Sequence, residues 1–205
     1  MKKSITKLLA LTILLVLSGC ASSYRPINPP ALKYNSQDLQ DGVGFSYKYE
    51  VLRERGNQDY AEQEIEEGIK LVAVKITNNT DSVINIGRNV ALFSGQSLLF
   101  PMEPATIHES IKQNVSQSLG FLLLGFINLT VTTDNSNKTY PIGLAIGAPL
   151  SIGNILLARS ANNKLWKELN QYNILYRDIQ KGETIYGIIG IKDMDYNTIT
   201  LKMIK

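Results

Sequence analysis

Short segments in which apolar and polar residues alternate recur along most of the chain, and they restrict its fold more than any other feature. In residues 43–51, Val43, Phe45, Tyr47, Tyr49 and Val51 would share one face of an extended chain, with small or polar residues on the other face. This period of two residues is typical of a half-buried strand. Residues 70–78 are apolar on both faces, which favours a strand at the centre of a sheet.

The same strand pattern returns several times, with turn residues between the segments. Ser94, Gly95 and Gln96 interrupt one apolar run as the turn of a hairpin would. About seven short strands in this order predict a mainly β protein, an antiparallel β-sandwich that occupies residues 41–205. The remaining predicted strands cover residues 82–86, 89–101, 173–179, 184–192 and 198–204.

The N-terminus has the order of a secretory signal peptide. Lysines accompany an apolar run over residues 8–17, and small residues follow up to Cys20. The apolar run is too short to span a bilayer as a permanent helix. We therefore expect residues 1–19 to be removed as a signal peptide.

Leu17-Ser18-Gly19-Cys20 resembles the lipobox of bacterial lipoproteins, in which a small residue precedes the cysteine. The resemblance implies that Cys20 carries a diacylglycerol thioether, that cleavage falls before it, and that palmitate or a similar chain acylates its new amine. Ala21-Ser22 lacks the aspartate of an inner-membrane retention signal, which favours the periplasmic side of the cell outer membrane. The inner membrane and the cell surface stay open, as does an ordinary signal peptide that leaves Cys20 unmodified.

Two stretches of the chain resemble the immunoglobulin-like domains of bacterial secreted lipoproteins. In residues 71–86 a strand pattern ends in an Asn-rich turn, and in residues 179–203 a Gly-Glu turn lies between strand patterns. The resemblance implies an immunoglobulin-like sandwich over residues 41–205, and it offers no active-site motif. The long apolar segment in the middle of the chain departs from this pattern, because such domains do not need one.

Two polar segments lie on either side of the first predicted strand. Residues 20–40 contain three prolines and no sustained period, so we expect a flexible, lipidated tether. Residues 53–68 contain six acidic residues and end in Gly68, which predicts a short exposed helix or a polar loop. This acidic segment lacks the Asp/Asn spacing and the central glycine of a calcium loop.

Residues 115–158 form an apolar insertion between the two blocks of strands. Asp134 and Lys138 are its only charged residues. We favour a helical hairpin that dips into the bilayer, because each apolar arm is close to the length of a membrane span. Two alternatives stay open. The arms form buried helices over the sandwich, or an extra β-hairpin, because residues 127–133 are rich in β-branched side chains.

An amphipathic helix is expected after the insertion, over residues 160–172. Ser160 suits the N-cap, and Leu165 and Leu169 are spaced as one apolar face of a helix. Trp166 has two open interpretations. It lies at the membrane interface as an anchor, or it is partly buried against the sandwich.

Several classes of protein are excluded because the chain lacks the residues or motifs that they need. Cys20 is the only cysteine, so no internal disulfide forms, and His108 is the only histidine, so no zinc-protease pair exists. The sequence has neither a phosphate-binding loop nor a nucleophile elbow. Removal of three signal-peptide lysines cancels the net charge of +3, which argues against a nucleic-acid partner. We therefore predict no catalytic, cofactor-binding or metal-binding residue.

Together these features predict a membrane-anchored, non-catalytic bacterial lipoprotein. Cys20 would hold it to the membrane, and residues 115–158 would either add a second membrane contact or pack on the domain. Its expected role is scaffolding, assembly or interaction in the envelope, with another envelope protein as partner. The alternative is a binding module in which the apolar insertion takes a lipid or a hydrophobic peptide.

Overall fold

The computed structural model describes residues 21–34, 36–116, 125–133, 136–192 and 195–204. Cys20, the predicted lipidation site, and the predicted signal peptide lie outside the described residues. The chain divides into two compact units. Unit 1 comprises the chain up to Ser23 together with Gln113–Ala161, and unit 2 comprises Tyr24–Lys112 together with Asn162–Lys205.

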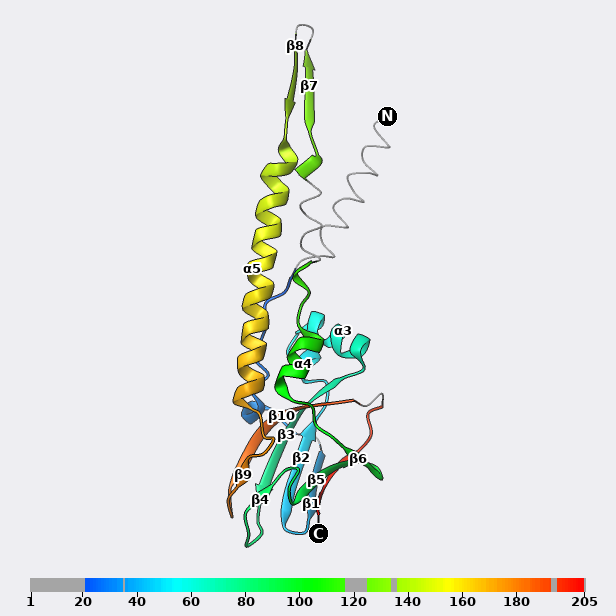
Figure 1. Ribbon diagram of the computed structural model, residues 1–205, viewed down its shortest axis with the longest axis vertical. Coiled ribbons are helices and arrows are strands. Elements are labelled where there is room, and N and C mark those ends of the chain that lie inside the picture. The colour runs from blue at the N-terminus through cyan, green and yellow to red at the C-terminus, as the bar shows by residue number, and fades with distance from the viewer. Residues whose placement is uncertain (1–20, 35, 117–124, 134–135, 193–194, 205) are drawn as a thin grey trace. The chain divides into compact units, whose positions relative to one another are not determined.

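The main sheet of unit 2 has four antiparallel strands in the order β1 (Ser36–Gln40), β2 (Val43–Lys48), β3 (Lys70–Asn78) and β10 (Thr184–Ile191). Strand β3 lies between β2 and β10 (Figure 1). Residues 71–74 of β3 are all buried, so the predicted central strand is confirmed. Strand β1 was not predicted.

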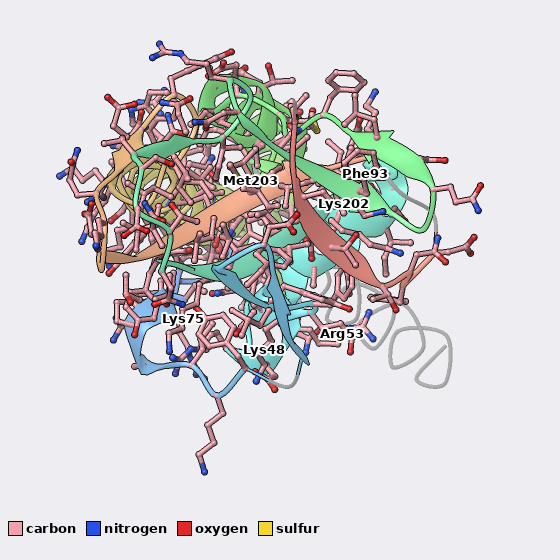
Figure 2. All side chains as sticks on the ribbon, turned by 90° about the horizontal axis from the view of Figure 1, so that it is seen from below. Lys48, Arg53, Lys75, Phe93, Lys202 and Met203 are labelled. Carbon is pink, nitrogen blue, oxygen red and sulfur yellow. The ribbon has the colours of Figure 1, made fainter. Side chains whose placement is uncertain are left out.

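Two smaller sheets complete the β structure of unit 2. The first has the order β11 (Ile199–Met203), β5 (Val90–Ser94) and β6 (Ser97–Leu99), and the second pairs β4 (Ile84–Asn85) with β9 (Asp178–Ile179). The β5–β6 hairpin turns at Gly95, whose φ of 58° favours glycine, as the sequence predicted. In the first sheet, the Nζ of Lys202 lies 4.9 Å from the centroid of the Phe93 ring (Figure 2).

One hydrophobic core joins the three sheets of unit 2. Phe45 of β2 pairs in register with Ile76 of β3, and Leu92 of β5 pairs with Leu201 of β11. These four side chains and Ile84 of β4 belong to a single buried cluster. Burying each such side chain stabilises the fold by roughly 1.5–3 kcal/mol. Unit 2 therefore combines several antiparallel sheets with a few helices, a mainly β architecture.

Short helices connect the strands of unit 2. Helices α2 (Val51–Glu54) and α3 (Gln58–Glu67) lie between β2 and β3, and α4 (Pro104–Ile111) follows β6. Gly68 ends α3 with a φ of 63°, a left-handed conformation that glycine adopts without strain. Of the two forms predicted for the acidic segment, the helix that stops at Gly68 is confirmed, although its Tyr60 and Ala61 are buried rather than exposed. Helix α4 was not predicted, although Pro104 in its first turn suits a helix start.

Residues 24–40 differ from the expected flexible tether. Tyr24 and Ile27 are 4 % and 0 % exposed. Pro29–Ala31 form the short 3-10 helix η1, and Ser36–Gln40 form β1 in the main sheet. Two buried apolar side chains and the pairing of β1 therefore hold this segment on unit 2, although its prolines and polar residues suggested a linker.

Unit 1 contains a β-hairpin and the first part of a long helix. Strand β7 (Leu129–Thr133) pairs with β8 (Ser136–Tyr140), and helix α5 (Ile142–Gln171) begins directly after β8 (Figure 1). The backbone N–H of Gly143 donates a 2.9 Å hydrogen bond to the carbonyl of Ile127. This bond ties the start of α5 to the segment that precedes β7.

The structure corrects the helical hairpin expected over residues 115–158. Residues 129–133 of the first arm form a strand, in agreement with the alternative that rested on β-branched side chains. The second arm is helical, and it continues through Pro149 into the amphipathic segment expected over residues 160–172. That segment is therefore the C-terminal part of α5 rather than a separate helix.

Candidate functional site

Large apolar side chains are exposed over the hairpin and the helix of unit 1. Phe126 is 79 % exposed, and Leu144, Ile152 and Leu156 are each 58–60 % exposed. We refer to the full set as the apolar surface of unit 1. It comprises Phe126, Ile127, Leu129, Val131, Tyr140, Ile142, Leu144, Leu150, Ile152, Leu156 and Leu157.

Most of this surface lies in a stretch of sequence that carries no charge. Residues 139–158 contain no Asp, Glu, Lys, Arg or His. Among the described residues, α5 is the one helix long and apolar enough to cross a membrane, and 29 % of its most apolar window is buried. Its part from Ile142 to Ala158 measures about 25 Å at 1.5 Å per residue, close to the roughly 30 Å of a hydrocarbon core.

A second face of α5 in unit 1 carries small and polar residues. Gly147, Ser151, Asn154 and Ala158 recur at intervals of three or four residues, and all are buried. Within the described part of the chain, the side-chain nitrogen of Asn154 has no hydrogen-bond partner. Small residues at this spacing allow close helix packing, in water as in lipid.

Unit 2 contains a cavity of about 290 Å³, which we call the α2–α3 pocket. Two inserted helices and the start of β3 form it, because Gly68 turns the chain from α3 directly into Ile69 and Lys70. Glu50, which precedes α2, has a φ of 56°, an uncommon left-handed conformation for a glutamate. The pocket is lined by Glu50, Arg53, Ala61, Glu64, Ile65, Gly68, Ile69, Lys70 and Tyr196.

Charged groups of both signs face this pocket. The Lys70 Nζ lies 3.8 Å from the centroid of the Tyr196 ring, and the Tyr196 hydroxyl donates a 3.3 Å hydrogen bond to Glu50 Oε1. Burial raises the pKa of Glu64 to about 7, although the backbone N–H of Leu71 donates to this carboxylate and lowers the pKa in part. Glu64 is therefore close to half protonated at neutral pH.

His108 has a structural position in α4. Its Nε2 lies 3.2 Å from the carbonyl oxygen of Asn162, and its ring packs edge-on against Trp166 at 5.4 Å. The His108 side chain is 17 % exposed. Trp166 is 38 % exposed. The described residues contain no group of three or more His, Cys, Asp or Glu that could hold a metal ion.

Sequence reasoning missed the residues of the α2–α3 pocket. Glu64 belongs to an acidic run that was interpreted as solvated surface, and Lys70 precedes an apolar strand without any motif around it. Tyr196 reaches both residues from the far end of the chain, after β10. No local sequence pattern indicates a contact between residues so far apart in the chain.

No family model, no curated protein and no solved structure matches this chain.

Proposed function

We propose that this protein is a non-catalytic bacterial lipoprotein with two membrane contacts. Lipid on Cys20 supplies the first contact, and the apolar surface of unit 1 supplies the second. Unit 2 then serves as a scaffolding or interaction domain for another envelope protein, on the periplasmic side of the outer membrane. The observation that carries the proposal is the apolar surface of unit 1, which is exposed on β7, β8 and the first half of α5 and carries no charge from residue 139 to residue 158.

We expect the apolar surface of unit 1 to be buried against lipid or against another molecule. Soluble monomers rarely expose contiguous apolar patches of more than a few hundred Å². Lipid suits the helical part, because α5 satisfies its own backbone hydrogen bonds and carries no charge between Lys138 and Arg159. The lipobox places an acyl anchor on the same chain, so unit 1 would work beside a membrane.

The two contacts would act together. The diacylglycerol expected on Cys20 already carries two acyl chains, which is enough for stable anchoring. Apolar side chains of unit 1 that enter the bilayer would add to this binding and increase the residence time further.

An immunoglobulin-like sandwich is the fold that we propose for unit 2. The buried cluster includes residues of the four-stranded sheet and residues of the sheet formed by β11, β5 and β6. Two antiparallel sheets that share one core are the defining feature of a β-sandwich. Such domains act widely as interaction modules, which supports the scaffolding role.

Flotation with neutral phosphatidylcholine vesicles tests the second membrane contact. The mature chain carries Cys20→Ser, so that lipid on the cysteine cannot contribute. We expect this chain to float, and we expect Leu144→Glu, Ile152→Glu and Leu156→Glu together to abolish flotation. The matched control places the same three charges at exposed polar positions of α5 in unit 2, as Asn163→Glu, Asn170→Glu and Gln171→Glu.

Three results would count against the proposal. If the Cys20→Ser chain stays with the soluble fraction, unit 1 is not a membrane element. Lipid that copurifies with that soluble chain would then favour the alternative, a module that binds lipid or hydrophobic peptide through the same surface. Unchanged processing and fractionation in cells after Cys20→Ala would remove the lipoprotein assignment itself.

A further inference from the structure

We propose that the α2–α3 pocket of unit 2 binds a small organic monocarboxylate, with its carboxylate held by Lys70 and Arg53. The apolar part of the ligand would lie against α3 and the start of β3. This binding site is independent of the membrane contacts proposed above. It rests on one buried cation without an acceptor, one cation without an ion pair, and a cavity beside both.

The ammonium of Lys70 is the first argument. Its Nζ is buried, and among the described residues it has no hydrogen-bond partner. The Tyr196 ring, 3.8 Å from Nζ to centroid, attracts the charge but accepts none of its three N–H groups. A buried ammonium without an acceptor is costly, and native structures normally provide one. An oxygen anion in the adjoining cavity would supply it.

The guanidinium of Arg53 is the second argument. Within the described part of the chain, Arg53 makes no ion pair within 4.0 Å, although it follows Glu50 and precedes Glu54 closely in sequence. Glu54 is engaged by Lys48 instead, with 2.8 Å between Nζ and Oε2, and Figure 2 labels both Lys48 and Arg53. The planar fork of an arginine binds a carboxylate through two parallel hydrogen bonds.

The charge balance of the pocket selects a monoanion. Lys70 and Arg53 contribute two positive charges and Glu50 one negative charge, so the side chains sum to one positive charge when Glu64 is protonated. One carboxylate on the ligand then neutralises the site. A dianion such as a phosphate monoester would leave excess negative charge next to Glu50, and a metal cation would meet two positive side chains.

The lining of the pocket selects a ligand with an apolar body. Ala61 and Ile69 are 3 % and 1 % exposed, while Ile65 is 65 % exposed at the rim. The volume of about 290 Å³ is at the lower limit of known ligand pockets, roughly 300–1,000 Å³. A short aliphatic or aromatic acid fits these limits, and a whole acyl lipid does not.

Protonation of Glu64 should strengthen binding. The charged groups that face Glu64 are Glu50, Arg53 and Lys70, with Tyr196 nearby and the N–H of Leu71 as a backbone donor. Its protonation removes a negative charge from beside the ligand carboxylate, which itself stays ionised near neutral pH. If the protonated form alone binds well, affinity falls by up to about tenfold between pH 6 and pH 8.

The test uses the full mature chain, in nanodiscs if it binds membranes and in buffer if it does not, with hexanoate as the probe. Saturation-transfer difference NMR measures binding, and empty nanodiscs give the blank for partition into lipid. We expect saturable binding of hexanoate, no competition by the neutral isostere hexanamide, and weaker binding of inorganic phosphate. Lys70→Met should weaken hexanoate binding by at least about tenfold. Lys75→Met, a loss of the same charge farther along β3, should leave it unchanged.

Four outcomes would overturn the proposal. The first is that hexanoate gives no saturable signal above the blank, and the second is that hexanamide binds as well as hexanoate. The third is that phosphate binds more tightly than hexanoate. The fourth is that Lys70→Met and the wild-type protein bind hexanoate with equal affinity. Arg53→Gln provides a second variant if Lys70→Met fails to fold, since Arg53 is exposed on α2. If Arg53→Gln then binds hexanoate as tightly as the wild-type protein does, the proposed binding site is wrong. Flotation of the Cys20→Ser chain is a separate readout, so each proposal can fail without the other.

Discussion

The hydroxyl of Tyr24 donates a 2.6 Å hydrogen bond to Glu168 Oε2, which joins two residues that lie 144 positions apart in the sequence. The same carboxylate accepts the backbone N–H groups of Ile27 at 3.0 Å and Asn28 at 2.8 Å. Burial, reinforced by the charge of Glu168, raises the pKa of Tyr24, so its phenol stays protonated and donates. One buried carboxylate on α5 thus fixes the N-terminal segment of unit 2.

Loss of this carboxylate should destabilise unit 2. Glu168→Ala leaves the buried Tyr24 hydroxyl and Ile27 N–H, and the partly buried N–H of Asn28, without an acceptor. We expect a loss of about 3 kcal/mol in the free energy of unfolding. Urea unfolding followed by far-UV circular dichroism measures it. The adjacent exposed substitution Lys167→Ala is the control and should change stability by less than about 0.5 kcal/mol. Equal midpoints for the two variants would show that the segment is held by burial of Tyr24 and Ile27 alone.

Contact between α4 and β10 depends on a glycine. A Cβ placed on Gly190 would lie 2.6 Å from Cγ1 of Ile107, a distance that real Cβ contacts do not show. We expect Gly190→Ala to destabilise the protein by about 1–3 kcal/mol through overpacking. Ile107→Val shortens the opposing side chain and should restore part of the loss in the double variant.

A glycine with open space around it provides the comparison for Gly190. Gly153 lies within α5 and has no atom within 4 Å of an added Cβ. Gly153→Ala should therefore stabilise the helix by about 0.5–1 kcal/mol. The melting temperatures of both variants test this difference. Similar decreases in Tm for Gly190→Ala and Gly153→Ala would exclude a specific clash at Ile107.

The ammonium of Lys70 should be unfavourable for folding when the pocket is empty. Lys70→Met keeps the apolar stem and removes a buried charge whose desolvation costs about 1–3 kcal/mol. Removal of the charge also removes its attraction to the Tyr196 ring, which lowers the gain in stability by roughly 0.5–1 kcal/mol. We expect a net increase of about 1 kcal/mol in the free energy of unfolding, measured in urea against Lys75→Met. A clear decrease would mean that Lys70 is satisfied within the folded chain.

Local patterns predicted the parts of the fold that local physics decides. The alternation around Phe45, the turn at Gly95 and the helix stop at Gly68 each follow from a few neighbouring residues, and the structure has all three. Single-sequence periodicity could not show that residues 36–40 pair with β2. This pairing comes from a partner strand rather than from the polar residues of β1 itself.

Long-range contacts account for what the sequence did not show. Nothing near Tyr24 signals a carboxylate 144 residues away, and nothing near Lys70 signals Tyr196. The apolar insertion was recognised by composition, yet composition could not separate helix from strand in its first arm. There the β-branched residues around Val131 form β7, while the arm after Pro141 forms α5.

The buried carboxyl of Glu64 should make stability depend on pH. Its folded-state pKa of about 7 lies above the ordinary value of 4.5, because burial disfavours the charged form. The folded protein therefore binds a proton at Glu64 more tightly than the unfolded chain does. The resulting stabilisation is fully present below about pH 4.5 and is lost as pH rises through about 7, a change of roughly 2–3 kcal/mol. Glu64→Gln, which keeps an acceptor for the Leu71 N–H, removes this dependence.

Urea unfolding at pH 5 and pH 8 measures the effect. The wild-type protein should lose more stability between these two values than Glu64→Gln does, by roughly 2 kcal/mol. Glu62→Gln, an exposed change on the same helix, should keep the wild-type difference. If all three proteins lose the same stability, Glu64 titrates as a solvated carboxylate. The pH dependence of ligand affinity expected for the α2–α3 pocket would then have no physical basis, although hexanoate could still bind to Lys70 and Arg53.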